Sequence, residues 1–178
     1  MVIFLNALYG GILMDEIIIE SPVKGELIPL KEVNDPAFAE EILGKGAAVK
    51  NPEGKVIAPF DGELAVFFDT KHALVIKSEK NGLELLVHVG IDTVKLQGKY
   101  FTAHKEQGEE VKKGDLLLTF DEPAIAANYD TVTTLVITNH EEFEDITITL
   151  DEAKIKVKGS DNEGTLDKIA KGIEKLLD

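Results

Sequence analysis

The chain has 178 residues, 44% of them hydrophobic, which is enough for one domain with a packed core. Its 33 acidic residues against 19 basic ones give a formal charge of −14, and every base is a lysine. An acidic surface without guanidinium groups disfavours nucleic acid as a partner, because phosphate contacts need a basic face. The lack of cysteine excludes disulfides, thiolate nucleophiles and cysteine-ligated zinc. The sequence therefore predicts an acidic cytoplasmic domain.

The first predicted element is an apolar N-terminal extension, residues 1–15, which begins MVIFLNALYGGILM. It is shorter than the roughly 20 apolar residues of a membrane span, and it lacks the basic start and cleavage site of a secretory signal. Three interpretations remain: a segment resting on a membrane surface, a buried extra strand or helix, or a gene start placed too early, with Met14 the true initiator. No lysine precedes Lys24, which weighs against the membrane surface.

Residues 16–158 are predicted to form a β domain. Short β-branched runs such as EIIIE, KVIAP, HALVIKS and TVTTLVIT alternate there with turn residues. Many short strands at this spacing are typical of an antiparallel sandwich or barrel rather than of alternating strands and helices. Residues 36–43 and 123–129 predict short helical turns, because each begins with a proline suited to a first turn. The predicted fold class is all-β and antiparallel.

The C-terminal part has a different pattern. The polar, glycine-flanked run GSDNEG at residues 159–164 predicts a linker. Residues 165–178 place apolar side chains at helical spacing, with lysines and acids opposite, and predict an appended amphipathic helix. This helix either folds back onto the β domain or binds a partner.

Four histidines are the main candidates for chemistry, and His72 and His88 lie in apolar strand contexts. Alternation along a strand determines which neighbours share a face with each ring. For His88 these neighbours are Glu84 and Leu86. For His72 they are Phe68, Thr70 and Leu74. Each ring has the alternative interpretation of an ordinary core histidine, but the large apolar neighbours and nearby turns favour a shared site.

The remaining motifs are weak. His104 and His140 lie in polar stretches and are predicted to be solvated. The sequence has no Walker loop, no GxGxxG after a strand, no HExxH and no GxSxG. Its acidic residues are scattered, so spacing nominates no glycosidase pair.

The segment LELLVHVGIDTVKLQGKYF, residues 83–101, resembles the active-site segment of the glucose-type enzyme IIA domain of the phosphoenolpyruvate:sugar phosphotransferase system. Upstream, SPVKGELIPLKEVNDPAFAEEILGKG and VIAPFDGELAVFFDTKHALVIKS are similar to the same family. Downstream, KKGDLLLTFDEPAIAANYDTVTTLVITN is similar to its closing strands. The resemblance covers about residues 21–150, and it implies an antiparallel β sandwich with little helix.

The resemblance also implies roles for particular residues. His88 is expected to be phosphorylated on Nε2, His72 to support the transfer, and the Thr70 hydroxyl to orient His72. A shallow apolar rim for partner proteins is expected at Phe38, Ile42, Leu43, Phe68, Leu86, Asp92 and Val94. Lys71 departs from the family pattern, where a smaller polar residue is expected; it either alters the charge near the phosphate or points away.

The implied function is that of a phosphocarrier, a phosphotransferase component that takes phosphate from phospho-HPr on His88 and passes it to an enzyme IIB cysteine for uptake of glucose-type sugars. The implied partners are HPr, an enzyme IIB/IIC sugar permease and regulated metabolic proteins, which places the domain in the cytoplasm or at the membrane through the permease. No cofactor is required, although His72 and His88 offer Zn²⁺ two ligands at a partner interface. The alternative function is a phosphorylation-dependent regulatory binding module without a transport role of its own.

Two other classes fit the sequence less well. A lysostaphin-type metallopeptidase needs a closely spaced His-x-His pair, which the sequence lacks. A lipoyl carrier domain, suggested by VIAPFDGEL and VKKGDLLLTFD, needs a lysine at a tight hairpin tip, and none is convincing.

Overall fold

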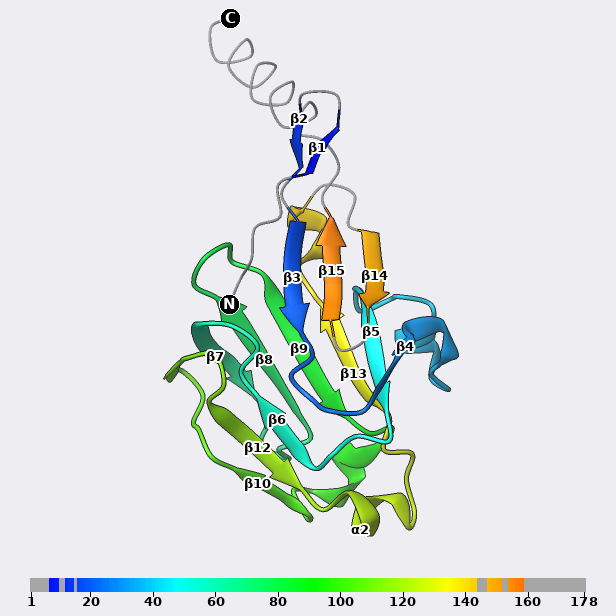
Figure 1. Cartoon of the computed structure of the whole chain (residues 1–178). Helices are drawn as coiled ribbons and strands as arrows, with labels where there is room; N and C mark the ends of the chain where they lie inside the picture. Colours follow the sequence, from blue (N-terminus) through cyan, green and yellow to red (C-terminus); the bar gives the residue numbers. More distant parts are fainter. Residues whose placement is uncertain (1–6, 10–11, 15, 144–146, 152–153, 159–178) are drawn as a thin grey trace, which may run out of the picture.

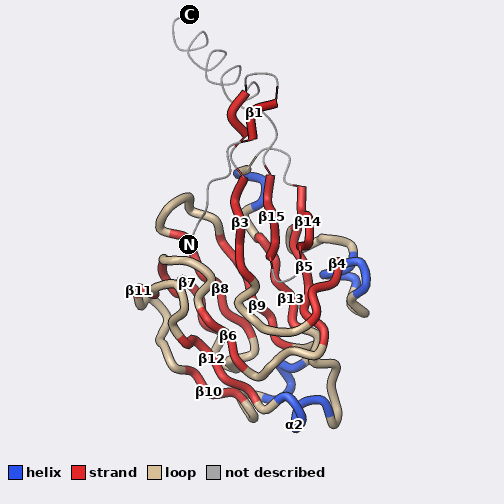
Figure 2. The backbone as a smooth tube through the Cα atoms, in the orientation of Figure 1, coloured by secondary structure: helices blue, strands red, loops and turns tan. Residues whose placement is uncertain are grey.

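The computed structural model describes residues 7–9, 12–14, 16–143, 147–151 and 154–158. Strands dominate this part of the chain and the helical elements are short (Figure 2). The all-β prediction is therefore confirmed. In the parts of the chain that the structure describes, no helix has the length and apolar content needed to cross a bilayer.

The largest sheet in the described residues has seven strands, and every neighbouring pair in it is antiparallel. Its order is β11 (Glu110–Val111), β7 (Gly62–Phe67), β8 (Ala73–Ser78), β9 (Glu84–Val89), β13 (Thr133–Ile137), β5 (Lys45–Lys50) and β4 (Glu26–Pro29). At its centre, β8 and β9 form a hairpin in which Ala73 pairs with His88. Strand β13 lies on the other side of β9 and pairs Thr134 with His88.

Two three-stranded antiparallel sheets lie in front of the large sheet in Figure 1. One has the order β14 (Thr147–Asp151), β15 (Lys154–Lys158) and β3 (Glu16–Glu20). The other has the order β10 (Phe101–Ala103), β12 (Leu116–Phe120) and β6 (Lys55–Ile57). A separate pair, β1 (Ala7–Tyr9) and β2 (Ile12–Met14), falls within the predicted N-terminal extension.

Two apolar cores lie on opposite faces of the large sheet, as strand alternation requires. The main core joins the large sheet to both three-stranded sheets, with Leu85 and Val87 of β9 packed in the same cluster as Ile19 and Ile155. The second core contains Leu86 of β9, so neighbouring residues of this strand serve opposite faces. The members of the second core are Ile28, Leu30, Val33, Phe38, Ala48, Ala73, Leu86, Val132 and Val136.

Helix α1 (Pro36–Ala39) brings Phe38 into the second core. Asp35 caps its N-terminus by accepting a hydrogen bond from the Ala37 amide at 2.9 Å. The helix is shorter than the predicted residues 36–43, because Glu41 adopts a left-handed φ of 55° that ends helical hydrogen bonding.

The other helical elements are short connections. The predicted helical turn at residues 123–129 is observed one residue earlier and shorter, as α2 (Glu122–Ala126). The 3₁₀ turns are η1 (Leu30–Glu32), η2 (Thr93–Leu96) and η3 (His140–Glu142). The predicted linker at residues 159–164 and the predicted helix at residues 165–178 lie outside the described residues.

Candidate functional site

His88 is the next-to-last residue of β9, and its side chain lies on the face of the second core, as alternation predicts. Its Nδ1 lies 2.9 Å from the carbonyl oxygen of Gly90. A carbonyl oxygen only accepts hydrogen bonds, so Nδ1 carries the ring proton. The neutral ring therefore has its lone pair on Nε2, where it can act as a nucleophile.

The turn after β9 holds the Gly90 carbonyl in place. Gly90 has a φ of 74°, and its amide donates to the Val132 carbonyl at 3.0 Å. Thr93 is fully buried, and its hydroxyl donates a short hydrogen bond to the Val89 carbonyl. A Cβ at position 90 would lie 2.5 Å from the Thr93 Cγ2. This turn therefore requires glycine, and Thr93 belongs to the support of the site.

His72 lies in the turn between β7 and β8, not on a strand. The turn is closed by hydrogen bonds from the Phe68 amide to the Ala73 carbonyl and from the Lys71 amide to the Phe68 carbonyl, at 3.1 and 2.8 Å. Lys71 has a left-handed φ of 57°. The predicted strand parity across this segment is therefore wrong, because the turn resets which way each side chain points. Leu74, predicted to share a face with His72, lies in the main core.

The turn nevertheless brings the predicted residues together. The Thr70 hydroxyl and Nδ1 of His72 share a hydrogen bond of 2.6 Å. The His72 carbonyl accepts from the Val89 amide at 2.8 Å, which ties this turn to the end of β9. The rings of His72 and His88 meet edge to face, with centroids 4.8 Å apart and planes at 86°. Two histidines 16 positions apart in the sequence thus share one site.

Burial controls the protonation of both rings. Burial, assisted by the neighbouring His88, lowers the pKa of His72 to about 4. Burial also lowers the pKa of His88, while the Gly90 carbonyl and the Asp35 carboxylate act in the opposite direction. Both rings are therefore neutral near pH 7, which is the state a nitrogen nucleophile needs.

The residues predicted to form a partner rim fall into two groups. Exposed fractions are 67% for Ile42, 43% for Leu43, 44% for Phe68 and 47% for Val94, and Asp92 is exposed as well. Phe38 and Leu86 are only 4% and 8% exposed. These two therefore lie beneath the surface rather than in an exposed rim.

The rim residues belong to the segments that hold the histidines. The ring of Phe68 lies 5.5 Å from His72, and the ring of Phe38 lies 5.2 Å from His88. Ile42 and Leu43 follow α1, and Asp92 and Val94 follow the Gly90 turn. The exposed apolar members, Ile42, Leu43, Phe68 and Val94, suit a surface on which another protein can exclude water from the imidazoles.

Lys71 points away from the paired rings. Its Nζ lies 4.6 Å above the centroid of Phe67, and the residue lines a different, polar cavity together with Asp69 and His104. Of the two alternatives for this departure from the family pattern, the structure favours the second.

The other two histidines lie apart from the site. His104 is exposed, as predicted, and its Nε2 is 2.9 Å from the Thr119 hydroxyl. His140, the first residue of η3, is half-buried rather than solvated, and its Nδ1 is buried without a hydrogen-bond partner among the described residues.

Sequence reasoning missed two residues near His88. Asp35 acts on the ring electrostatically, and its signal was the Asp-Pro pair that opens α1. Thr93 acts through the backbone, and a threonine soon after a glycine turn gives only a weak signal. Among the described residues, no group of three or more histidines and carboxylates is arranged to hold a metal ion. A metal at His72 and His88 would need ligands from elsewhere.

A mostly antiparallel β sandwich with two facing imidazoles and an exposed apolar rim defines the class of the enzyme IIA phosphotransferase domain. The family model for the phosphoenolpyruvate-dependent sugar phosphotransferase system, EIIA 1, matches residues 17–143. The chain belongs to this family. It is accordingly an EIIA-type domain of the sugar phosphotransferase system.

Named relatives agree with this membership. The glucose-specific EIIA component of Oceanobacillus iheyensis is 44% identical over 74% of this chain and 79% of its own length. The β-glucoside-specific EIIBCA component of Dickeya chrysanthemi is 47% identical over 77% of this chain, but the match covers only 22% of that protein. The glucose permease IIA of Mycoplasma capricolum has the same fold, with a TM-score of 0.66 and 30% identity over 81% of this chain and 96% of that one.

Proposed function

We propose that the domain accepts a phosphoryl group from phosphorylated HPr on Nε2 of His88 and passes it to a cysteine of an enzyme IIB domain. The observation that supports this most directly is the hydrogen bond from Nδ1 of His88 to the Gly90 carbonyl, which leaves the lone pair on the other ring nitrogen. The pairing with His72 gives that nitrogen a neighbouring imidazole.

In the first step, the Nε2 lone pair of His88 attacks the phosphorus atom of the donor phosphohistidine. A new N–P bond forms while the donor N–P bond breaks, and the donor nitrogen leaves with the electron pair. In the second step, the thiolate of the acceptor attacks phosphorus and the electron pair returns to Nε2. Nδ1 keeps its proton throughout, so positioning and charge stabilisation do most of the work.

His72 and Thr70 are proposed to stabilise the transferring phosphoryl group. Because the pKa of His72 is lowered to about 4, its ring is neutral at physiological pH, and one of its nitrogens can donate a hydrogen bond to a phosphoryl oxygen. The Thr70 hydroxyl bonds the other nitrogen and fixes the orientation of the ring. A donor held in a fixed orientation can stabilise the charge that develops on the phosphoryl oxygens during transfer.

The partner surface is proposed to be the exposed rim of Ile42, Leu43, Phe68 and Val94, which adjoins the His72 ring through Phe68. Its apolar side chains would exclude water, which would otherwise hydrolyse the phosphohistidine. The charge of −14 would steer the domain toward basic partner patches in a salt-dependent way. One relative is named as glucose-specific and another as β-glucoside-specific, which supports a glucose-type sugar or a β-glucoside as the transported substrate.

A phosphate relay with purified components tests this proposal. Enzyme I, HPr and phosphoenolpyruvate are mixed with the protein and, in parallel, with enzyme IIB domains from glucose and β-glucoside systems. We expect one acid-labile, alkali-stable phosphate on the protein, then transfer to at least one IIB cysteine. The His88→Gln variant should accept none, and the His72→Gln variant should accept phosphate but donate it poorly. Labelling of His88→Gln at the wild-type level would overturn the assignment.

A further inference from the structure

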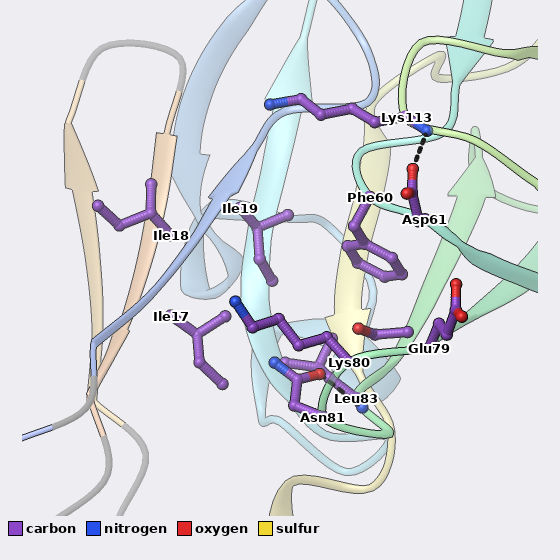
Figure 3. Close-up of a pocket in the computed structure, with 11 residues that line it drawn as sticks. Ile17, Ile18, Ile19, Phe60, Asp61, Glu79, Lys80, Asn81, Leu83 and Lys113 are labelled. Carbon is purple, nitrogen blue, oxygen red and sulfur yellow. Dashed lines mark hydrogen bonds between the residues drawn. The ribbon is translucent and has the colours of Figure 1, made fainter. Parts of the chain in front are cut away.

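A cavity of about 570 Å³ lies between strand β3 and the turn that joins β8 to β9 (Figure 3). In the β8–β9 hairpin, Ala73 pairs with His88 at one end. At the other end Lys77 pairs with Glu84, next to the turn at residues 79–81, which lines the cavity. The cavity and the paired histidines therefore lie at opposite ends of one hairpin, and the phosphate relay does not use the cavity. Its volume is within the range of about 300–1,000 Å³ that is typical of small-molecule sites.

The inner walls of the cavity are the edge of the main core. Figure 3 shows Ile17 and Ile19 of β3 on one side, and Phe60 and Leu83 on the other. Ile18 also lines the cavity. Ile19 and Leu83 are each 1% exposed and Phe60 is 8% exposed, and all three belong to the main core. The cavity therefore offers a ligand an apolar surface that is already largely removed from water.

Ser78, the last residue of β8, adds a hydroxyl group to these apolar walls. Leu74 and Ile76, four and two positions earlier, face the main core, so alternation directs the Ser78 side chain to the same face. The residue is 7% exposed and lines the cavity. Its amide and carbonyl are bonded to Leu83 and Gly82 at 2.8 and 3.0 Å, but its hydroxyl has no hydrogen-bond partner among the described residues. A buried hydroxyl without a partner is unfavourable, so this group is available to a ligand.

Asn81 adds a second hydrogen-bond donor to the cavity lining. The residue is exposed, and its Oδ1 accepts a hydrogen bond from the Leu83 amide at 3.1 Å. This bond leaves the Nδ2 group of Asn81, which only donates hydrogen bonds. A ligand oxygen that accepts hydrogen bonds, such as a carbonyl oxygen, suits both this group and the Ser78 hydroxyl.

The charged groups around the cavity already have partners. The ion pairs are Lys113 with Glu20 at 3.3 Å, Lys112 with Asp61 at 3.7 Å and Lys112 with Glu79 at 3.8 Å, and Lys80 has an interaction partner as well. A charged ligand would have to compete with these pairs and would lose its own hydration against apolar walls. The cavity therefore favours an uncharged ligand.

We propose that the cavity binds an uncharged small molecule with an apolar body and a carbonyl oxygen, such as a ketone or an ester. The apolar body lies against Ile19, Phe60 and Leu83, and the carbonyl oxygen accepts a hydrogen bond from the Ser78 hydroxyl. Binding then gives the hydroxyl a partner and removes the remaining apolar surface from water. The site is independent of the phosphate relay, because none of its residues belongs to the paired histidines or to the rim.

Two probes of the same shape test this assignment in the full chain. 4-Phenylbutan-2-one has an apolar body and a ketone oxygen, whereas 3-phenylpropanoate has the same body with an ionised carboxylate in place of the methyl ketone. In titrations followed by ¹H–¹⁵N NMR, we expect the ketone to bind with a Kd of about 1 mM or below and to shift the amide signals of β3 and of residues 78–83. We expect the carboxylate to bind at least about tenfold more weakly, because its charge must lose hydration.

A pair of serine variants tests the role of the hydroxyl. Ser78→Ala removes the proposed donor, and we expect it to weaken binding of the ketone by about 3–10-fold. Ser21→Ala is the matched control, because the Ser21 hydroxyl already donates to the Val23 carbonyl at 2.6 Å and the residue does not line the cavity. We expect this control variant to bind the ketone with the affinity of the wild type.

Other outcomes would overturn the proposal. No binding of the ketone at its solubility limit would show that the cavity is not a ligand site, and equal affinities for the two probes would contradict selection against charge. An unchanged affinity in Ser78→Ala would remove the hydroxyl from recognition. Shifts centred on His72 and His88 would place the ketone at the phosphate site. Binding that appears only in a variant lacking residues 2–6 would show that the chain itself fills the cavity.

Discussion

The carbonyl oxygen of Gly90 lies 2.9 Å from Nδ1 of His88, two residues earlier in the chain. This bond decides which ring nitrogen keeps the proton, so the shape of a glycine turn determines which nitrogen is the nucleophile. Gly90 has a left-handed φ of 74°, and Thr93 and Asp130 leave no room for a Cβ there.

Gly90→Ala should therefore destabilise the protein by more than backbone strain alone would. We expect the free energy of unfolding to fall by about 3 kcal/mol, because the left-handed conformation and the contact with Thr93 both oppose the new methyl group. We also expect part of the His88 population to carry its proton on Nε2, as measured by ¹⁵N NMR of the ring. Urea denaturation gives the stability change.

Gly82→Ala is the matched control for this prediction. Gly82 has a similar φ of 72°, but nothing lies within 4 Å of the Cβ position. Gly82→Ala should lower the free energy of unfolding by about 1 kcal/mol and leave the His88 tautomer unchanged. Equal losses in the two variants would show that the crowding at Gly90 is unimportant.

The hydroxyl of Thr70 should matter for onward transfer. Thr70→Val keeps the size of the side chain but removes the partner of His72 Nδ1, which leaves a buried nitrogen unsatisfied at a cost of about 1–3 kcal/mol. We expect the rate of transfer to the IIB cysteine to fall by about 10–100-fold. Thr70→Ser, which restores the hydroxyl, should recover most of it in rapid-quench assays; failure of that rescue would argue against the hydrogen bond.

The lowered pKa of His72 predicts a pH dependence of stability. Burial lowers this pKa to about 4, below its value in an unfolded chain, so the unfolded state binds more protons between the two values. The stability that comes from keeping His72 neutral and buried is fully present above about pH 6.5, and it is lost as the pH falls toward 4. Between pH 7 and pH 5 this corresponds to about 2 kcal/mol of unfolding free energy.

The control for the pH dependence is His72→Gln, which cannot titrate. Since the many carboxylates of the chain also titrate at low pH, the quantity to compare is the difference between wild type and variant in urea denaturation. The wild type should lose more stability than His72→Gln between pH 7 and pH 5. Parallel pH profiles would show that His72 is not buried in its neutral form.

The exposed rim should govern partner affinity rather than chemistry. Ile42 is 67% exposed, so Ile42→Asp can be made without disturbing the core. We expect the KM for phospho-HPr to rise about tenfold or more, with little change in the rate at saturation, because an apolar contact is replaced by a charge that must be desolvated. Ile57→Asp, a change at a 38% exposed residue of β6 on another sheet, should leave both parameters unchanged.

The sequence predicted His88 better than His72, and the reason is local. Strand β9 is regular, so alternation correctly separated His88 and Leu86 from Leu85 and Val87. Around His72 a turn interrupts the alternation, and only tertiary hydrogen bonds, such as that from the Val89 amide to the His72 carbonyl, bring the ring to its partner. No periodicity contains that information.

Burial could not be read from the sequence either. Phe38 and Leu86 are apolar residues of the kind expected in an exposed rim, but in the structure both are buried in the second core. In the sequence, Thr93 resembles any threonine in a turn. Only the structure shows that its buried hydroxyl donates a hydrogen bond to the Val89 carbonyl. These residues are defined by contacts between segments distant in sequence, whereas the strands follow from local pattern.

The most direct test of the account is the position of the phosphoryl group after incubation with enzyme I, HPr and phosphoenolpyruvate. Phosphorus and nitrogen NMR of the labelled protein distinguish the two ring nitrogens of each histidine. We predict one phosphate per chain, on Nε2 of His88, with the Nδ1 proton still bonded to Gly90. Phosphate on Nδ1 of His88, or on His72, His104 or His140, would contradict it.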